Sequence, residues 1–190
     1  MARFCIALPL ALTAGLLSAC HPTPATSSVA GPAHPVSHGS NPPSLAQLRA
    51  APLLIPSAVE PAVHPTLTFA VMFASWCGHC HVQLDILNRL RLAHPTVNFI
   101  GLSYAPFEEF NANGDLARLR TYVAANAPWL PIYALPEALY QRVGRPSKVP
   151  TLWAFSADGA LVATFDRAVR SAPEFEELAA LVAAAQPAIQ

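Results

Sequence analysis

The stretch FAVMFASWCGHC, residues 69–80, is an apolar run that ends in two cysteines separated by two residues. The apolar residues 67–73 have the length and composition of a short buried β-strand. From Val82 onward, apolar and polar residues are mixed as on an amphipathic helix. The two cysteines are therefore expected at a junction between a strand and a helix.

A thiol at such a junction is expected to be unusually acidic. The unpaired N–H groups and the dipole of a helix's first turn stabilise an anion, so Cys77 should be the more acidic thiol of the pair. Cys80 follows three residues later on the same helical face and can close a disulfide with Cys77. His79 lies between them and, when protonated, would favour the Cys77 thiolate over the disulfide.

The string WCGHC, residues 76–80, preceded by a strand and followed by a helix, resembles the active site of the thioredoxin superfamily. Val149-Pro150 supports the resemblance, because it lies about seventy residues downstream, directly before an apolar strand, where that superfamily carries its cis-proline. The resemblance implies an α/β chain with a thioredoxin fold, in which a central mixed sheet is flanked by helices. It also implies that the Pro150 loop lies against the cysteines.

The middle of the chain predicts an αβ unit inserted into this fold. A helix is expected from Asp115 to about Ala125, followed by a short strand at residues 130–135, where Pro131 suggests an edge strand or a bulge. Such an insert resembles the membrane-anchored TlpA/ResA-like group and peroxiredoxin-like relatives. A hairpin around the Asp158-Gly159 turn and a last helix complete the expected fold.

The N-terminus reads as an export signal over residues 1–19, with Arg3 before an apolar segment. Small residues before Cys20 resemble a bacterial lipobox, in which Cys20 is lipidated and begins the mature protein; an ordinary cleaved signal is the alternative. Residues 20–60 are interpreted as a disordered Pro/Ala/Ser-rich tether, with a possible short helix from Ser44, and residues 61–190 as the thioredoxin-like domain. Residues 53–55 are apolar enough to pack against this domain or to pair with its sheet.

Composition narrows the functional classes. The formal net charge is zero, so no electrostatic argument favours binding to nucleic acid. Cys5 would leave with the signal and Cys20 would be lipidated, which leaves Cys77 and Cys80 as a pair that is more consistent with catalysis than with a structural bridge. We expect neither a cofactor nor a metal. The protein is predicted to face the periplasm from a lipid anchor, and His21 does not decide between the inner and outer membrane.

The sequence departs from the family at the group that moves the second cysteine's proton. Val71 occupies the place of the acid that relatives bury six residues before the first cysteine, and Gln83 occupies the place of a glutamate three residues after the second. Neither can serve as the carboxylate base. His81, Asp85 or water remain as candidates, although a solvated pair on the helix surface is the favoured interpretation of His81 and Asp85.

The resemblance implies a thiol–disulfide oxidoreductase in which Cys77 forms a mixed disulfide with a substrate and Cys80 resolves it. Trp76 would shield the pair, Gly78 and His79 would support it, and Val149-Pro150 would dock the substrate backbone. Its partners would be cysteine-containing exported proteins and an unidentified protein that recharges the pair. The Gly-His dipeptide resembles that of protein disulfide isomerases, but the direction of electron flow stays open.

Two other functions fit the same residues. The string at residues 77–81 satisfies C-x-x-C-H, the attachment motif of c-type haem, but no methionine follows it to serve as the second axial ligand. A copper or zinc chaperone site could use Cys77, Cys80 and a nearby histidine, which is too few ligands for a closed structural zinc site.

Overall fold

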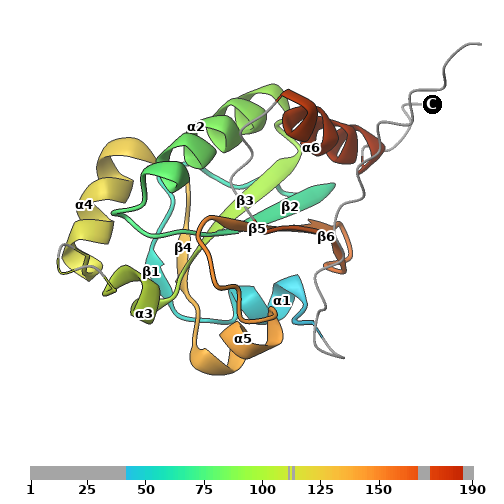
Figure 1. Ribbon diagram of the computed structural model, residues 1–190. Coiled ribbons are helices and arrows are strands. Elements are labelled where there is room, and N and C mark those ends of the chain that lie inside the picture. Colours follow the sequence, from blue (N-terminus) through green and yellow to red (C-terminus); the bar gives the residue numbers. More distant parts are fainter. Residues whose placement is uncertain (1–41, 111, 113, 167–171, 186–190) are drawn as a thin grey trace, which may run out of the picture. The chain divides into compact units, whose positions relative to one another are not determined.

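The computed structural model describes residues 42–110, 112, 114–166 and 172–185, and these form the domain drawn in colour in Figure 1. The export signal, Cys20 and most of the expected tether lie outside the described residues. No helix within the described residues has both the length and the hydropathy needed to cross a membrane.

A mixed β-sheet forms the middle of the domain, with strand order β1-β4-β3-β2-β5-β6. Strands β2, β3 and β4 run parallel to one another, whereas β1, β5 and β6 each pair antiparallel with their neighbours. The strands are β1 (Leu53–Ile55), β2 (Leu67–Met72), β3 (Val97–Ser103), β4 (Ile132–Ala134), β5 (Thr151–Ser156) and β6 (Leu161–Phe165). The mixed sheet and its flanking helices agree with the fold predicted from the sequence.

Helices cover both faces of the sheet, so that β2 is buried along its whole length. Phe69 and Val71 pack into the core beneath α2, α4 and α6, whereas Ala70 and Met72 pack into the core beneath α1 and α5. This two-sided burial explains why β2 is continuously apolar instead of alternating. Figure 1 shows α2 and α1 on opposite sides of the sheet. The helices are α1 (Leu45–Arg49), α2 (Gly78–Ala93), α3 (Ala105–Glu108), α4 (Leu116–Asn126), α5 (Glu137–Arg142) and α6 (Ala172–Ala185).

The segment 44–55 belongs to the folded domain. The short helix expected from Ser44 is α1, and Ser44 and Gln47 form a capping box at its start. Leu48 is fully buried in the core beneath the sheet. The strand β1 pairs with β4, which satisfies its backbone and partly buries its apolar side chains. The folded domain therefore starts earlier than residue 61.

The inserted unit consists of α3, α4 and β4, between β3 and α5. Asp115 caps α4 by accepting a hydrogen bond from the backbone N–H of Arg118. Of the two alternatives predicted from Pro131, the edge strand was wrong, because β4 lies between β1 and β3. The bulge agrees with the register shift in the pairing of β1 with β4, where Leu53 lies opposite Tyr133 and Ile55 opposite Ile132. The carbonyl of Pro131 still joins the sheet by accepting the backbone N–H of Gly101 at 2.8 Å.

Candidate redox site

Cys77 lies at the junction that the sequence predicted. The strand β2 ends at Met72, and Cys77 is the N-cap of α2 with an extended backbone. Its sulfur accepts the backbone N–H of Cys80 at 3.3 Å, which is the contact that an N-cap side chain makes with its helix. Both cysteines are free thiols here. The loop from Phe73 to Trp76 therefore places one sulfur at the positive end of a helix.

The environment of Cys77 favours its thiolate. Hydrogen bonding from the Cys80 thiol is the largest cause that lowers the pKa of Cys77 to about 6, and it outweighs the opposing effect of burial. The backbone N–H groups of Cys80 and His79 and the charge of His81 lower the pKa further. The sulfur is nearly covered, with 7% of the residue exposed. A thiol of this acidity is largely ionised at neutral pH.

Cys80 has the opposite environment. Its side chain is fully buried, and this desolvation is the main reason that its pKa is raised far above that of a free thiol. The hydrogen bond to Cys77 and the negative charge of Glu108 raise the pKa of Cys80 further. The pair thus consists of one acidic thiol near the surface and one protonated thiol behind it.

The Val149-Pro150 loop lies against Cys77. The peptide bond between these two residues is cis, and the Cys77 thiol donates to the carbonyl of Val149 at 3.7 Å. The side chain of Thr151 donates to the carbonyl of Lys148 at 2.9 Å and closes the loop. The two cysteines and the proline loop were predicted from segments about seventy residues apart in the sequence, and the structure brings them into contact.

The other residues expected to support the pair differ in their contacts. Trp76 is half-buried, and its indole N–H donates to the carbonyls of Phe107 and Glu108 at 2.9 and 3.1 Å. Gly78 and His79 are exposed in the first turn of α2. His79 acts on Cys77 through its backbone N–H, whereas the imidazole whose charge lowers the pKa of Cys77 is that of His81.

His81 is not the solvated surface residue that the sequence suggested. Its Nε2 lies 2.9 Å from the carbonyl oxygen of Ser75, and because a carbonyl only accepts, Nε2 carries the hydrogen. The ring stacks on Tyr122 of α4 with 4.3 Å between centroids. Packing against α4 therefore holds this imidazole beside the redox pair. Asp85 is exposed, in agreement with the prediction of a solvated side chain.

One residue of the site, Glu108, was not predicted from the sequence. This glutamate is 3% exposed at the end of α3. One carboxylate oxygen accepts the backbone N–H of Ser75 at 2.9 Å, and the other accepts the Ser75 hydroxyl. Val71 and Gln83 occupy the places where a carboxylate was expected and are both buried. The buried carboxylate of this site thus comes from the insert, and no motif in the sequence indicates it.

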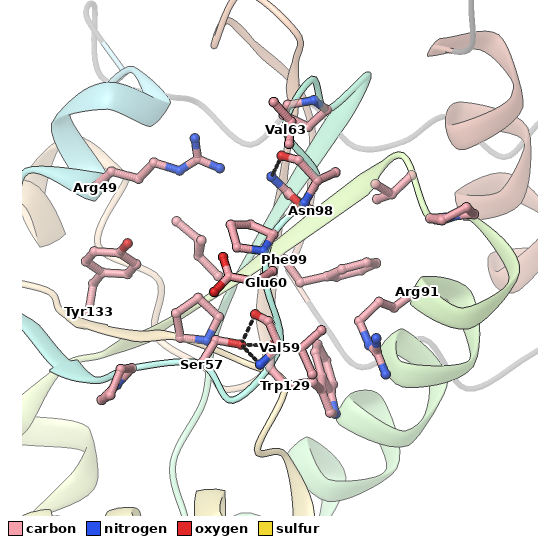
Figure 2. A pocket seen from close by; sticks show the side chains of 18 of the residues that line it. Arg49, Ser57, Val59, Glu60, Val63, Arg91, Asn98, Phe99, Trp129 and Tyr133 are labelled. Atoms are coloured by element: carbon pink, nitrogen blue, oxygen red, sulfur yellow. Dashed lines mark hydrogen bonds between the residues drawn. The ribbon is translucent and has the colours of Figure 1, made fainter.

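One cavity lies away from the cysteines. It measures about 720 Å³ and is bordered by Arg91 near the end of α2, by the first residues of β3 and by Trp129. Figure 2 shows Ser57 bonded to Val59 and Trp129 at its wall. Because α2 rises by 1.5 Å per residue, Arg91 lies about 20 Å along the helix from Cys77, so this cavity is not part of the redox site.

Among the described residues, no group of three or more His, Cys, Asp or Glu side chains is placed to hold a metal ion. This covers the part of the chain that contains Cys77 and Cys80.

Comparisons with known proteins agree with the architecture. No protein-family model and no curated protein sequence matches the chain. A thioredoxin-like protein from Aeropyrum pernix superposes with a TM-score of 0.51 at 15% identity, over 63% of this chain and 79% of that one. A DsbF homologue from Corynebacterium diphtheriae gives 0.50 at 17% identity, over 64% and 73% of the two chains. A putative thiol:disulfide interchange protein DsbE from Chlorobium tepidum gives 0.50 at 14% identity, over 71% and 96%. The domain has the thioredoxin fold.

Proposed function

We propose that this thioredoxin-fold chain is a thiol–disulfide oxidoreductase that exchanges disulfides with exported proteins through Cys77 and Cys80. The observation that carries the proposal is the contrast between the two thiols. Cys77 has a pKa of about 6 beside the Val149 carbonyl, whereas Cys80 is fully buried with a raised pKa. Such an asymmetric pair supports a nucleophile that attacks first and a thiol that reacts second.

The reductive direction of the cycle has two displacements. The Cys77 thiolate attacks one sulfur of a substrate disulfide, a Cys77–substrate bond forms, and the other substrate sulfur leaves as a thiolate that takes up a proton. Cys80 then loses its proton and attacks the Cys77 sulfur, which forms the Cys77–Cys80 bond and releases the second substrate thiolate. Two electrons pass from the enzyme's dithiol to the substrate. The reverse sequence oxidises a substrate dithiol.

The Val149-Pro150 loop is the proposed docking place for the substrate backbone. The carbonyl of Val149 lies next to the Cys77 sulfur, so an extended substrate segment that pairs with it would bring its own sulfur to Cys77. Trp76 is tied to α3 by its indole N–H and shields the pair from one side. Gly78 leaves open space beside the first turn of α2, since a Cβ there would meet nothing within 4 Å.

The low pKa of Cys77 supports an oxidising pair, because stabilising the thiolate stabilises the reduced form. An unidentified recharging partner would set the direction in the cell. The export signal at residues 1–19 and the lipobox-like Cys20 support a lipid-anchored location facing the periplasm, with residues 20 to about 43 as the tether.

The haem alternative fits the structure less well. Attachment would need both sulfurs to be accessible, yet Cys80 is fully buried. The His81 ring, which would have to bind the iron, is stacked on Tyr122 and bonded to Ser75.

Reduction of insulin disulfides by the full-length chain in detergent tests the proposal. Cys77→Ser is expected to abolish turnover, because serine cannot form the mixed disulfide. Cys80→Ser is expected to accumulate mixed disulfides that non-reducing gels resolve. Cys20→Ser is the matched control and should keep turnover unchanged. A Cys77→Ser protein with full activity would disprove the mechanism.

A further inference from the structure

The resolving step requires Cys80 to lose a proton from a fully buried position. Burial is the largest cause of its raised pKa, so the thiolate forms unfavourably unless a base receives the proton. Of the two sulfurs in the pair, only that of Cys77 is partly exposed, and a substrate docked at Val149 would cover it. The two places expected to hold a carboxylate contain Val71 and Gln83. A different exit for the proton is therefore needed.

Glu108 lies behind the pair and is connected to it. Both of its carboxylate oxygens accept hydrogen bonds from Ser75, which directly follows Ala74 in the chain, and the backbone of Ala74 hydrogen-bonds Cys80. The negative charge of Glu108 is near enough to contribute to the raised pKa of the Cys80 thiol. A carboxylate near a buried thiol is the chemical type of group that general-base catalysis uses.

A second cavity has Glu108 in its wall. It measures about 410 Å³ and is lined by the end of β3 and by residues of α3, α4 and β4, among them Ser103, Leu119 and Ala134. Neither cysteine, Val149 nor Pro150 lines it. Its volume exceeds that of several water molecules at about 30 Å³ each. Solvent can therefore reach Glu108 while the front of the site is covered.

We propose that Glu108 is the base that receives the Cys80 proton during resolution and passes it to solvent through the cavity between α3, α4 and β4. This inference rests on the proposed function and adds the proton's route to it. The Cys80 sulfur, once deprotonated, attacks the Cys77 sulfur of the mixed disulfide. The substrate leaves as a thiolate and takes up a proton from solvent, while Glu108 returns its own proton to solvent, so the proton balance closes.

Other titratable groups face this region and must be considered in a pH profile. His81 of α2 and Tyr122 of α4 lie beside the pair, and Cys77 itself is hydrogen-bonded to Cys80. Tyr104, Glu109 and Glu137 lie in the cavity wall, and Asp85 lies on the adjoining surface of α2. Arg145 and Tyr140 act on Tyr104 from outside the cavity wall.

The two displacements can be followed separately with Ellman's reagent, an aromatic disulfide. Attack by Cys77 releases one coloured thiolate, and resolution by Cys80 releases the second. The full-length chain is used with Cys5→Ser and Cys20→Ser, so that only the redox pair reacts. We expect Glu108→Gln to slow the second release by about 100-fold at pH 7, the lower end of the range for general-base catalysis. The first release should change by less than about threefold, which also reports that the variant is folded.

The pH profile separates proton transfer from a structural role. Without the carboxylate, hydroxide must remove the proton, so the second rate of Glu108→Gln should rise about tenfold per pH unit and approach the parent's rate at alkaline pH. Glu108→Ala should recover part of its second rate in formate, which can enter through the cavity. Glu109→Gln, the exposed neighbour at the same cavity, is the matched control and should behave as the parent does.

Three outcomes would overturn parts of the reasoning in different ways. A second release that keeps the parent's rate and pH profile in Glu108→Gln rules out Glu108 as the base. An equal loss in both releases at all pH values assigns Glu108 a purely structural role and equally rejects the inference. A parent protein that never releases the second thiolate, while Cys77 reacts, rejects the proposed function itself.

Discussion

Replacing Cys80 with alanine should raise the pKa of Cys77. The shift of the Cys77 thiol from 9.0 to about 6 corresponds to about 4 kcal/mol of differential stabilisation, taken as an order of magnitude. The Cys80 side chain is the largest favourable cause of that shift, whereas the backbone donors and His81 would remain in the variant. We therefore expect a rise of at least about one pKa unit, which lowers the thiolate fraction at pH 7 from about nine-tenths to about half or less.

Cys80→Ser is the matched control, because its hydroxyl can still donate a hydrogen bond to the Cys77 sulfur. The pKa of Cys77 should therefore rise less in the serine variant than in the alanine variant. Alkylation of Cys77 by iodoacetamide, followed against pH by peptide mass spectrometry, gives both values and keeps the Cys5 and Cys20 peptides apart. Equal pKa values in the two variants, or an alanine variant that stays near 6, would refute the assignment of the Cys80 thiol as the main stabiliser.

Three further predictions concern stability, measured by urea unfolding under reducing conditions. Leu48→Ala should cost about 2–5 kcal/mol because Leu48 is fully buried, whereas Leu53→Ala at a 51% exposed position should cost much less; equal losses would contradict the inclusion of α1 in the core. As the pH rises from about 6 to 9, the free energy of unfolding of the reduced parent should increase relative to that of Cys77→Ser by up to about 1 kcal/mol per pH unit, because the unfolded thiol keeps its proton to higher pH than the folded one. A free energy of unfolding that increases on acidification instead would contradict the lowered pKa of Cys77. Gly101→Ala should cost about 1–3 kcal/mol because its Cβ would collide with Ile132 Cδ1, and adding Ile132→Val should recover part of the loss; no recovery would locate the clash elsewhere.

The sequence could predict those parts of the site that depend on local patterns. An apolar run followed by helical spacing places Cys77 at the start of a helix without any knowledge of distant contacts, and α2 begins at Gly78 as expected. The strand after Pro150 and the turn at Gly159 are equally local, and Gly159 has the positive φ of 83° that favours glycine. These elements have their cause within a few residues of themselves.

The parts that could not be predicted depend on contacts between distant segments. The helix α3 has only four residues, so it carries no periodicity that a sequence could reveal. The Ser75–Glu108 contact joins positions 33 residues apart. The orientation of His81 depends on Tyr122, which belongs to another helix. Likewise, the segment 44–55 is short and contains several alanines and prolines. Only the pairing of β1 with β4 shows that this segment joins the sheet.

The insert explains how the site can dispense with a carboxylate at either expected position. Three hydrogen-bonding groups of the 75–76 loop, the Ser75 N–H, the Ser75 hydroxyl and the Trp76 indole, all donate to α3. This loop directly precedes Cys77, so α3 fixes the entry to α2 and, with it, the place of the sulfur at the helix end. The same contacts bring the Glu108 charge close to Cys80. A carboxylate supplied by the insert leaves position 71 free to hold a core valine and position 83 free to hold a neutral glutamine. Loss of α3 should therefore disturb the geometry of Cys77 and the proton transfer from Cys80 together, whereas Glu108→Gln, with the Trp76 contacts intact, should disturb mainly the second.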